Sequence, residues 1–263
     1  MIWTSSRIQE IGLSSLSCDP IRHVLGHETV LENEKNCDPR DMGHKKYMLL
    51  LDTRLAAGYF LVQGDHTNAR KWAAISVDAA ETYFFGEWRD IQPSGNGSDQ
   101  PPSREYQEIN EHWVDSYDWS MCFIAALQQW DTFDRFAHIL RDDVRLNIDQ
   151  TEAHRAWWLY FCGRVRKRPQ QEIAGFRQTV MEAKRAKTDQ LLLTWVDALF
   201  EGSDDELQDA IKKYFQHHRR VESKKPGLGL AIRGSILLHY GEHLGRQFSR
   251  PDNSDLYIVE FGE

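Results

Sequence analysis

The amino-acid sequence predicts an all-α protein of stacked antiparallel helical hairpins, in a tetratricopeptide-like or irregular bundle, with a short extended C-terminal tail. Apolar residues recur at i, i+3, i+4 and i+7 in successive segments between residues 44 and 244, a spacing that places them on one helical face. Short breaks near residues 64, 130, 166 and 202 separate these segments, and the last two intervals are both 36 residues long. Helices joined by such short breaks must pack antiparallel.

The segment from Thr188 to Arg246 carries the clearest helical signals. Its first helix has a single apolar stripe, made of Leu192, Trp195, Val196 and Leu199. After a break at Gly202, Ser203 and Glu206 have the spacing of a capping box, in which both side chains accept hydrogen bonds from backbone N–H groups. A second helix follows the box, and we expect a third helix from Leu228 to Leu244.

The first legible hairpin lies in the N-terminal half of the chain. A helix is predicted from His44 to Gly64, and after a Gly-Asp turn an alanine-rich helix carries Trp72 and Tyr83 on its apolar stripe. This order of helix, turn and alanine-rich helix is similar to a tetratricopeptide hairpin, although the consensus Trp and Pro positions are not matched. We therefore expect the geometry of a helical pair.

Four further helices connect these two parts of the chain. Apolar periodicity predicts helices over residues 113–127 and 133–140. Thr151 then has the position of an N-cap for the next helix, and its partner helix starts after Pro169, a residue type that favours helix starts. The final residues, 255–261, are expected to form an extended tail that packs on the bundle.

Two segments are expected to lack long helices. Residues 1–43 are predicted to be irregular, with short helices and loops, because they are interrupted by Pro20, Gly26, Pro39 and Gly43. Residues 89–104 are rich in Gly, Ser and Pro, a composition that predicts a flexible surface loop. The helices on both sides of this loop carry apolar stripes that can be buried only against each other. Residues 1–263 are therefore expected to form a single domain.

Composition and charge narrow the classes of function. The chain has 32 basic and 40 acidic residues, a formal net charge of −8, which argues against nucleic-acid binding and is compatible with a basic protein partner. The sequence has no run of about 18 apolar residues and no signal-peptide pattern at its start, so we expect a cytoplasmic protein without a membrane span. The four cysteines show no C-x-x-C spacing, and buried reduced thiols are expected.

One motif suggests chemistry. His239, Glu242 and His243 have the H-x-x-E-H form of inverted zinc metallopeptidases. Only 20 residues follow His243 to supply a further acidic ligand. Gly241 lies inside the motif, and with Gly234 it marks a close helix-packing face instead. We therefore expect no metal, no cofactor and no catalytic residue, and keep a zinc-dependent hydrolase as the less favoured alternative.

The C-terminal third resembles bacterial immunity protein family 49, an all-helical group associated with polymorphic-toxin systems. The resemblance is carried by the helix Leu191–Phe200, the acidic turn Glu201–Asp204, the segment Ala210–Arg220, and the small-residue helix that ends at His243-Leu244-Gly245. It implies a non-enzymatic cytoplasmic protein that binds and neutralises a toxin domain. It assigns no catalytic residue.

These observations favour a binding protein that captures a basic toxin domain in a stoichiometric complex. Acidic side chains at the hairpin end are the candidate contacts, because they complement a basic cleft; they are Asp204, Asp205, Glu206 and Asp209. The alternative among non-enzymes is a helical-repeat adaptor or scaffold protein that presents a groove to a peptide.

Overall fold

The computed structural model describes residues 39–85, 113–140, 151–224 and 229–261, and these ranges are all-α, with no β-strand in them. The α-helices are α3 (Pro39–Gln63), α4 (His66–Phe85), α6 (Trp113–Ala126), α7 (Trp130–Ile139), α8 (Glu152–Val165), α9 (Gln170–Glu182), α10 (Lys187–Glu201), α11 (Asp204–Arg220) and α12 (Ile232–His243). Two short 3₁₀-helices, η3 (Glu222–Lys224) and η4 (Ser254–Leu256), follow α11 and α12.

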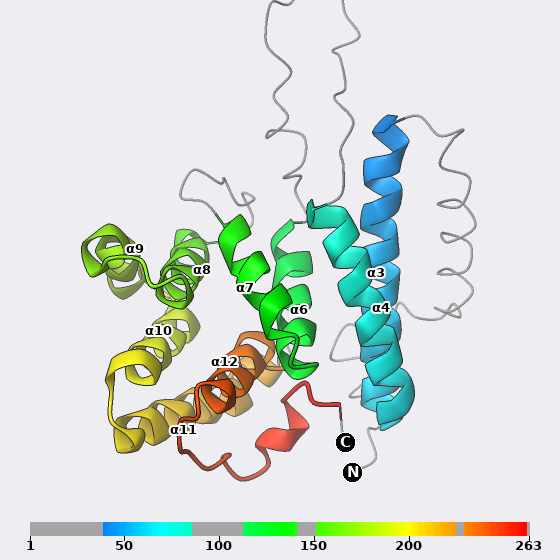
Figure 1. Ribbon diagram of the computed structural model, residues 1–263. Coiled ribbons are helices and arrows are strands. Elements are labelled where there is room, and N and C mark those ends of the chain that lie inside the picture. Colours follow the sequence, from blue (N-terminus) through cyan, green and yellow to red (C-terminus); the bar gives the residue numbers. More distant parts are fainter. Residues whose placement is uncertain (1–38, 86–112, 141–150, 225–228, 262–263) are drawn as a thin grey trace, which may run out of the picture.

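Helices that are consecutive in the chain pack in pairs: α3 with α4, α8 with α9, and α10 with α11. The α3–α4 pair lies at one side of the molecule, α6 and α7 lie in the middle, and α8 to α11 form the other side (Figure 1). The last helix departs from this order, because α12 packs against α6 and α10. The last helix of the chain therefore packs against α6, a helix from the middle of the sequence.

The predicted breaks near residues 64, 130, 166 and 202 all fall between helices. Gly64 has φ +76° in the α3–α4 turn, a conformation that glycine adopts without steric cost. Asp65 then accepts a hydrogen bond from the backbone N–H of Asn68 at 3.1 Å and caps α4. Thr151 caps α8 as expected, since its side chain accepts a hydrogen bond from the backbone N–H of His154.

Three helix starts differ from the expected ones, and the first of these is α7, which begins at Trp130 and not at Phe133. Helix α3 begins at Pro39, inside the segment 1–43 that was expected to be irregular, and not at His44. Proline suits a first helical position, because the N–H that it lacks would have no partner within the helix. Helix α12 begins at Ile232 and not at Leu228. The expected irregular residues 1–38 and the expected loop at 89–104 lie outside the described residues.

The middle of helix α8 is buried on all sides. Apolar spacing predicts that only one of the two adjacent indoles points inward, yet Trp157 and Trp158 are both 0% exposed, and burial is continuous from Ala156 to Gly163. Helices α6, α7, α9, α10 and α12 supply the surrounding aromatic and aliphatic side chains. The middle of this helix therefore forms the centre of the helical protein.

The expected tail, residues 255–261, packs on the bundle, but Asp255 and Leu256 lie in the 3₁₀-helix η4 and not in an extended segment. After η4, the tail residues Tyr257, Ile258, Val259 and Phe261 are buried. The Ala231 N–H donates to the Tyr257 carbonyl at 2.7 Å, and the Val259 N–H donates to Ser235 Oγ at 2.9 Å. These two bonds hold the tail along α12, and the first of them gives the backbone N–H of Ala231, just before that helix, a hydrogen-bond partner.

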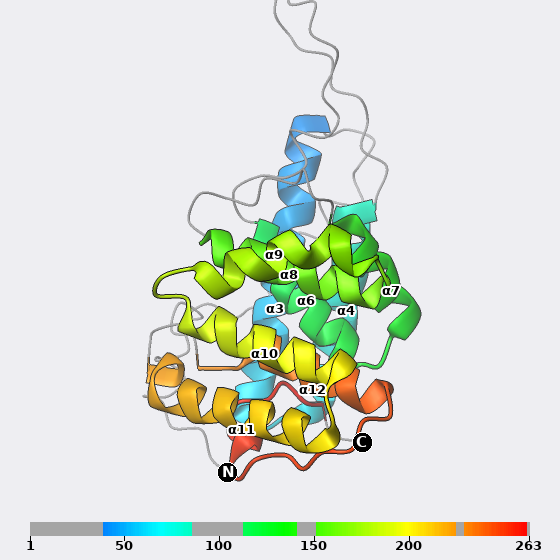
Figure 2. The same ribbon diagram turned by 90° about the vertical axis from the view of Figure 1, so that its left-hand side faces the viewer.

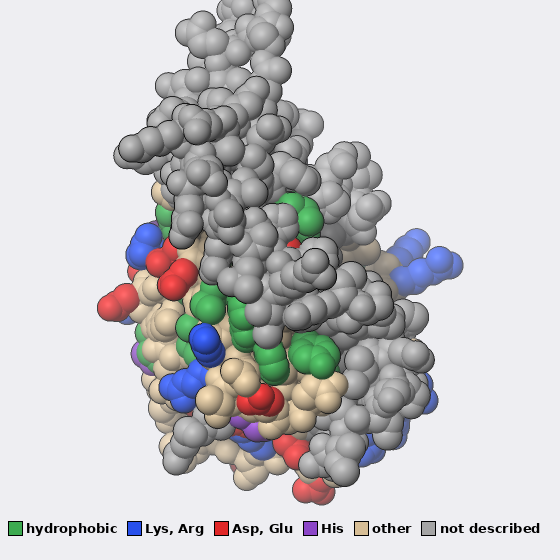
Figure 3. All heavy atoms as spheres, turned by 90° about the vertical axis from the view of Figure 1, so that its right-hand side faces the viewer, with side chains coloured by type: hydrophobic (Ala, Val, Ile, Leu, Met, Phe, Trp, Pro, Cys, Tyr) green, Lys and Arg blue, Asp and Glu red, His purple; other side chains and the backbone are tan. Residues whose placement is uncertain are grey.

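Figure 3 shows the side of the molecule on which α3 and α4 lie. On this side of the molecule, hydrophobic side chains reach the surface among charged ones (Figure 3). Phe85, at the end of α4, is 38% exposed. Arg135 of α7 lies over its ring at 4.5 Å and pairs with Glu81 at 2.7 Å. This contact links α4 to α7 at the edge of the pair.

Candidate partner-binding surface

The four acidic residues singled out from the sequence all lie in the first two turns of α11, and all four are exposed. Helix α11 buries a stripe of Leu207, Ala210, Ile211, Tyr214 and Phe215. The acidic residues therefore fall on the side of the helix that faces solvent, as the helical period predicts. Their individual contacts show which of them are available to a partner.

Glu206 is part of the structure of the helix start. The Ser203 side chain accepts a hydrogen bond from the Glu206 N–H at 3.3 Å, and the Ser203 N–H donates to the Glu206 carboxylate at 2.7 Å. The predicted capping box is therefore confirmed. The backbone and hydroxyl of Ser203 hold the pKa of the Glu206 carboxyl below its ordinary value. Glu206 thus fixes the direction in which α11 leaves the turn.

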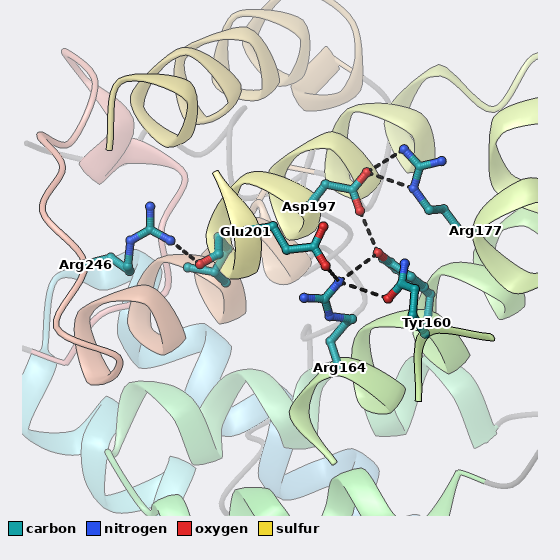
Figure 4. A network of polar contacts seen from close by, with 8 residues as sticks. Tyr160, Arg164, Arg177, Asp197, Glu201 and Arg246 are labelled. Atoms are coloured by element: carbon teal, nitrogen blue, oxygen red, sulfur yellow. Dashed lines mark hydrogen bonds and ion pairs between the residues drawn. The ribbon is translucent and has the colours of Figure 1, made fainter. Parts of the chain in front are cut away.

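Asp204 is tied to a residue 42 positions away. Arg246, which follows α12, donates to Asp204 Oδ1 at 3.1 Å. The same guanidinium donates to the carbonyl of Gly202 at 2.8 Å and to those of Ala198 and Leu199 at the end of α10. An arginine in this place adds hydrogen bonds to the last carbonyls of the helix, among which that of Ala198 also accepts from the Gly202 N–H. Arg246 therefore joins the end of α10, the start of α11 and the segment after α12. Figure 4 shows Arg246 beside the end of α10.

A second polar network braces the other side of α10 (Figure 4). Tyr160 donates to Asp197 Oδ1 at 2.7 Å, and Arg177 donates to Asp197 Oδ2 through both Nε and Nη2, at 3.0 and 2.9 Å. Burial, and then the hydrogen bond with Asp197, raise the pKa of Tyr160. Arg164 donates to Glu201 at 2.5 Å. The network connects α8, α9 and α10, so it fixes the hairpin that carries the acidic turn.

Of the four acidic residues, Asp205 and Asp209 make the fewest contacts that stabilise the fold. Asp209 pairs with Lys213 at 2.5 Å, one turn along α11, and both side chains are more than half exposed. Such a pair contributes little to stability. Asp205 makes no hydrogen bond or ion pair with any residue that the structure describes. The sequence motif revealed the role of Glu206, but no local signal could have revealed that Arg246 holds Asp204.

The residues of the H-x-x-E-H motif make structural contacts. His239 is buried, and its Nε2 lies 2.8 Å from the Val259 carbonyl, so this nitrogen donates a hydrogen bond to the tail. His243 is exposed and stacks on Trp130, with the ring centroids 4.1 Å apart. Within the described ranges, no group of three or more His, Cys, Asp and Glu side chains is arranged to hold a metal ion. The spacing is thus explained by packing at both histidines.

Glu242 of the same motif gives the protein a predicted sensitivity to acid. Its Oε2 lies 3.4 Å from His239 Nδ1, and its Oε1 accepts a hydrogen bond from Arg250 at 2.8 Å. The contact with His239, opposed by burial and helped by Arg250, holds the pKa of the Glu242 carboxyl below its ordinary value of 4.5. A carboxyl group whose pKa is lower in the folded than in the unfolded protein stabilises the fold at pH values above its unfolded pKa. This stabilisation is lost as the pH falls through the folded pKa.

We therefore expect the free energy of unfolding of the wild-type protein to fall more steeply below pH 4.5 than that of a Glu242→Gln variant. Urea unfolding of both proteins between about pH 3 and 7 measures this difference. Equal slopes in the two proteins across the acid range would show that Glu242 has the same pKa in the folded and unfolded chains.

The two cysteines within the described residues are free and buried. Burial raises the pKa of Cys162 to about 12, and burial raises that of Cys122 further. Both side chains therefore remain protonated thiols, which are unreactive. The expectation of buried reduced thiols is confirmed for these two; Cys18 and Cys37 lie outside the described residues.

These contacts describe an all-α protein with an exposed acidic turn on a braced helical hairpin. Comparison of the chain with models of protein families, with curated proteins and with solved structures finds no match. The resemblance to immunity proteins thus stays a prediction. Among the helices that the structure describes, none is long and apolar enough to cross a membrane.

Proposed function

We propose that this chain is a non-enzymatic binding protein, which neutralises a basic toxin domain by forming a stoichiometric complex with it in the cytoplasm. The observation that carries the proposal is the acidic turn between α10 and α11. Its exposed carboxylates stand on a hairpin that the capping box, Arg246 and the Asp197 network hold in place. A surface ordered before binding loses less conformational entropy when a partner docks.

Charge supports the same proposal. The net charge of −8 and the exposed carboxylates at the start of α11 favour encounter with a basic protein. A nuclease domain is one such partner, because its own active site must attract phosphate. The resemblance of residues 191–245 to immunity family 49 points to the same class of partner. The proposal assigns no nucleophile, base or cofactor to the chain.

Co-expression with toxin domains encoded next to this protein tests the proposal. We expect the protein to rescue growth and to co-purify with the toxin domain in a stoichiometric complex. Full protection by a catalytic amount of the protein, or rescue without a detectable complex, contradicts it. If the protein binds an extended peptide and does not rescue growth, the helical-repeat adaptor is favoured instead.

Charge reversal at the acidic turn tests the role of its side chains. Asp205→Lys combined with Asp209→Lys is expected to lower the association rate by about tenfold or more at low salt, and to weaken its salt dependence. The measurement is stopped-flow or surface-based kinetics at several salt concentrations. Asp204 is left unchanged, because reversing its charge would also release Arg246 from the turn.

The matched control is Asp78→Lys, an exposed position on α4, at the opposite side of the molecule from α11 (Figure 1). Two charge reversals at the turn should slow association far more per charge than this remote one. Equal effects per charge would show that net charge alone steers the partner and that the turn has no special part in binding.

A further inference from the structure

A partly exposed surface with aromatic side chains lies beside the acidic turn. Trp130, at the start of α7, stacks on His243 at the end of α12, with ring planes 18° apart. The next residue, Leu244, is 43% exposed, and Phe200 at the end of α10 is partly exposed. We call Trp130, Phe200, His243 and Leu244 the aromatic edge. Its members come from three helices that are distant in the sequence.

Shared contacts make the aromatic edge continuous with the acidic turn. The ring of Tyr240 lies 6.1 Å from that of Trp130 and 6.0 Å from that of Phe200, so it connects the two ends of the edge. Phe200 directly precedes Glu201, and Arg246 binds both the end of α10 and Asp204. The end of α10, the start of α11 and the end of α12 accordingly lie along one side of the molecule (Figure 2).

The outward charge of this region is negative although it contains arginines. In the pair of Arg164 with Glu201, the arginine side chain is 13% exposed and the glutamate 59%. In the pair of Arg246 with Asp204, the corresponding exposures are 20% and 54%. The guanidinium groups thus lie beneath their carboxylates, so an approaching partner meets the carboxylates first.

We propose that the aromatic edge and the acidic turn together form one docking surface for a basic folded protein domain. The apolar edge would bury against the centre of the partner's surface, and Glu201, Asp204 and Asp205 would pair with its cations at the rim. Partly exposed aromatic side chains and an exposed leucine, surrounded by charged groups, have the composition of binding hot spots. Charge complementarity selects a basic occupant. This inference rests on the proposed function and assigns the surface that performs it.

The test uses the complex of the full chain with a toxin domain that the co-expression experiment identifies as its partner. Leu244→Asp and, separately, Trp130→Ala are expected to raise the dissociation constant at least about tenfold, mainly through faster dissociation. Met181→Asp is the matched control, because Met181 is 47% exposed on α9, away from the edge, and it should leave binding unchanged. Melting temperatures of the free variants show whether each one is folded.

Leu244→Asp decides the outcome if Trp130→Ala loses stability together with its stack on His243. If the wild-type protein and Leu244→Asp bind the toxin domain equally well, the docking surface is wrong. The proposed function is not contradicted by that result. If the wild-type protein binds no such domain, both the docking surface and the proposed function are contradicted. Loss of binding in Met181→Asp as well would place the partner on a different or much larger surface.

Discussion

Replacing Arg233 with methionine is expected to destabilise the protein by about 3–5 kcal/mol, because it removes one partner from a buried ion pair. Arg233 of α12 donates to Asp189 of α10 at 2.6 Å, and their side chains are only 14% and 10% exposed. The guanidinium also lies over the ring of Trp157, 5.0 Å from its centroid. Without Arg233, the Asp189 carboxylate would stay buried with no compensating charge. Chemical unfolding measures the loss.

Two variants separate this explanation from a general loss of packing. The double replacement Arg233→Met with Asp189→Leu should recover much of the stability, since an apolar pair of similar size can replace a buried ion pair. Lys213→Met, in the exposed pair with Asp209, should cost less than about 1 kcal/mol. A double variant no more stable than Arg233→Met alone would mean that the buried charge of Asp189 is not the cause.

Replacing Gly234 with alanine is expected to cost about 1–3 kcal/mol, although alanine is the better helix former. A Cβ atom at Gly234 would lie 2.5 Å from Cε1 of Tyr214 on α11, closer than packed carbon atoms approach. Tyr214 is itself buried. Helix α12 would therefore have to shift away from the α10–α11 hairpin. Chemical unfolding of the variant measures the cost.

A glycine without close neighbours provides the control for Gly234. No atom would come within 4 Å of a Cβ at Gly175 on α9, so Gly175→Ala should gain up to about 1 kcal/mol from helix propensity. In a Tyr214→Leu background, Gly234→Ala should cost less than in the wild type, because the clashing ring is absent. The same cost in both backgrounds would show that contact with Tyr214 is not responsible.

The amino-acid sequence predicted most of the helical segments and the turns between them, but not the starts of α3, α7 and α12. Gly64 and the Ser203–Glu206 box act through backbone groups within a few residues, so their effect is visible in a short window of sequence. The paired glycines were also interpreted correctly: a Cβ at Gly234 would meet Tyr214, and one at Gly241 would meet Phe248 and Leu199. Such small residues inside a helix indicate close packing, but not the partner.

Only the tertiary structure decided which distant residues meet. Helix α12 packs against α6 and α10, and this placement brings Arg246 to Asp204 and Trp130 to His243. Periodicity shows that a helix has a buried face, but the same face fits several neighbours, and the choice depends on side-chain packing across the whole core. For this reason the sequence identified an acidic turn, whereas the fold showed which of its carboxylates serve the structure and which apolar side chains lie beside them.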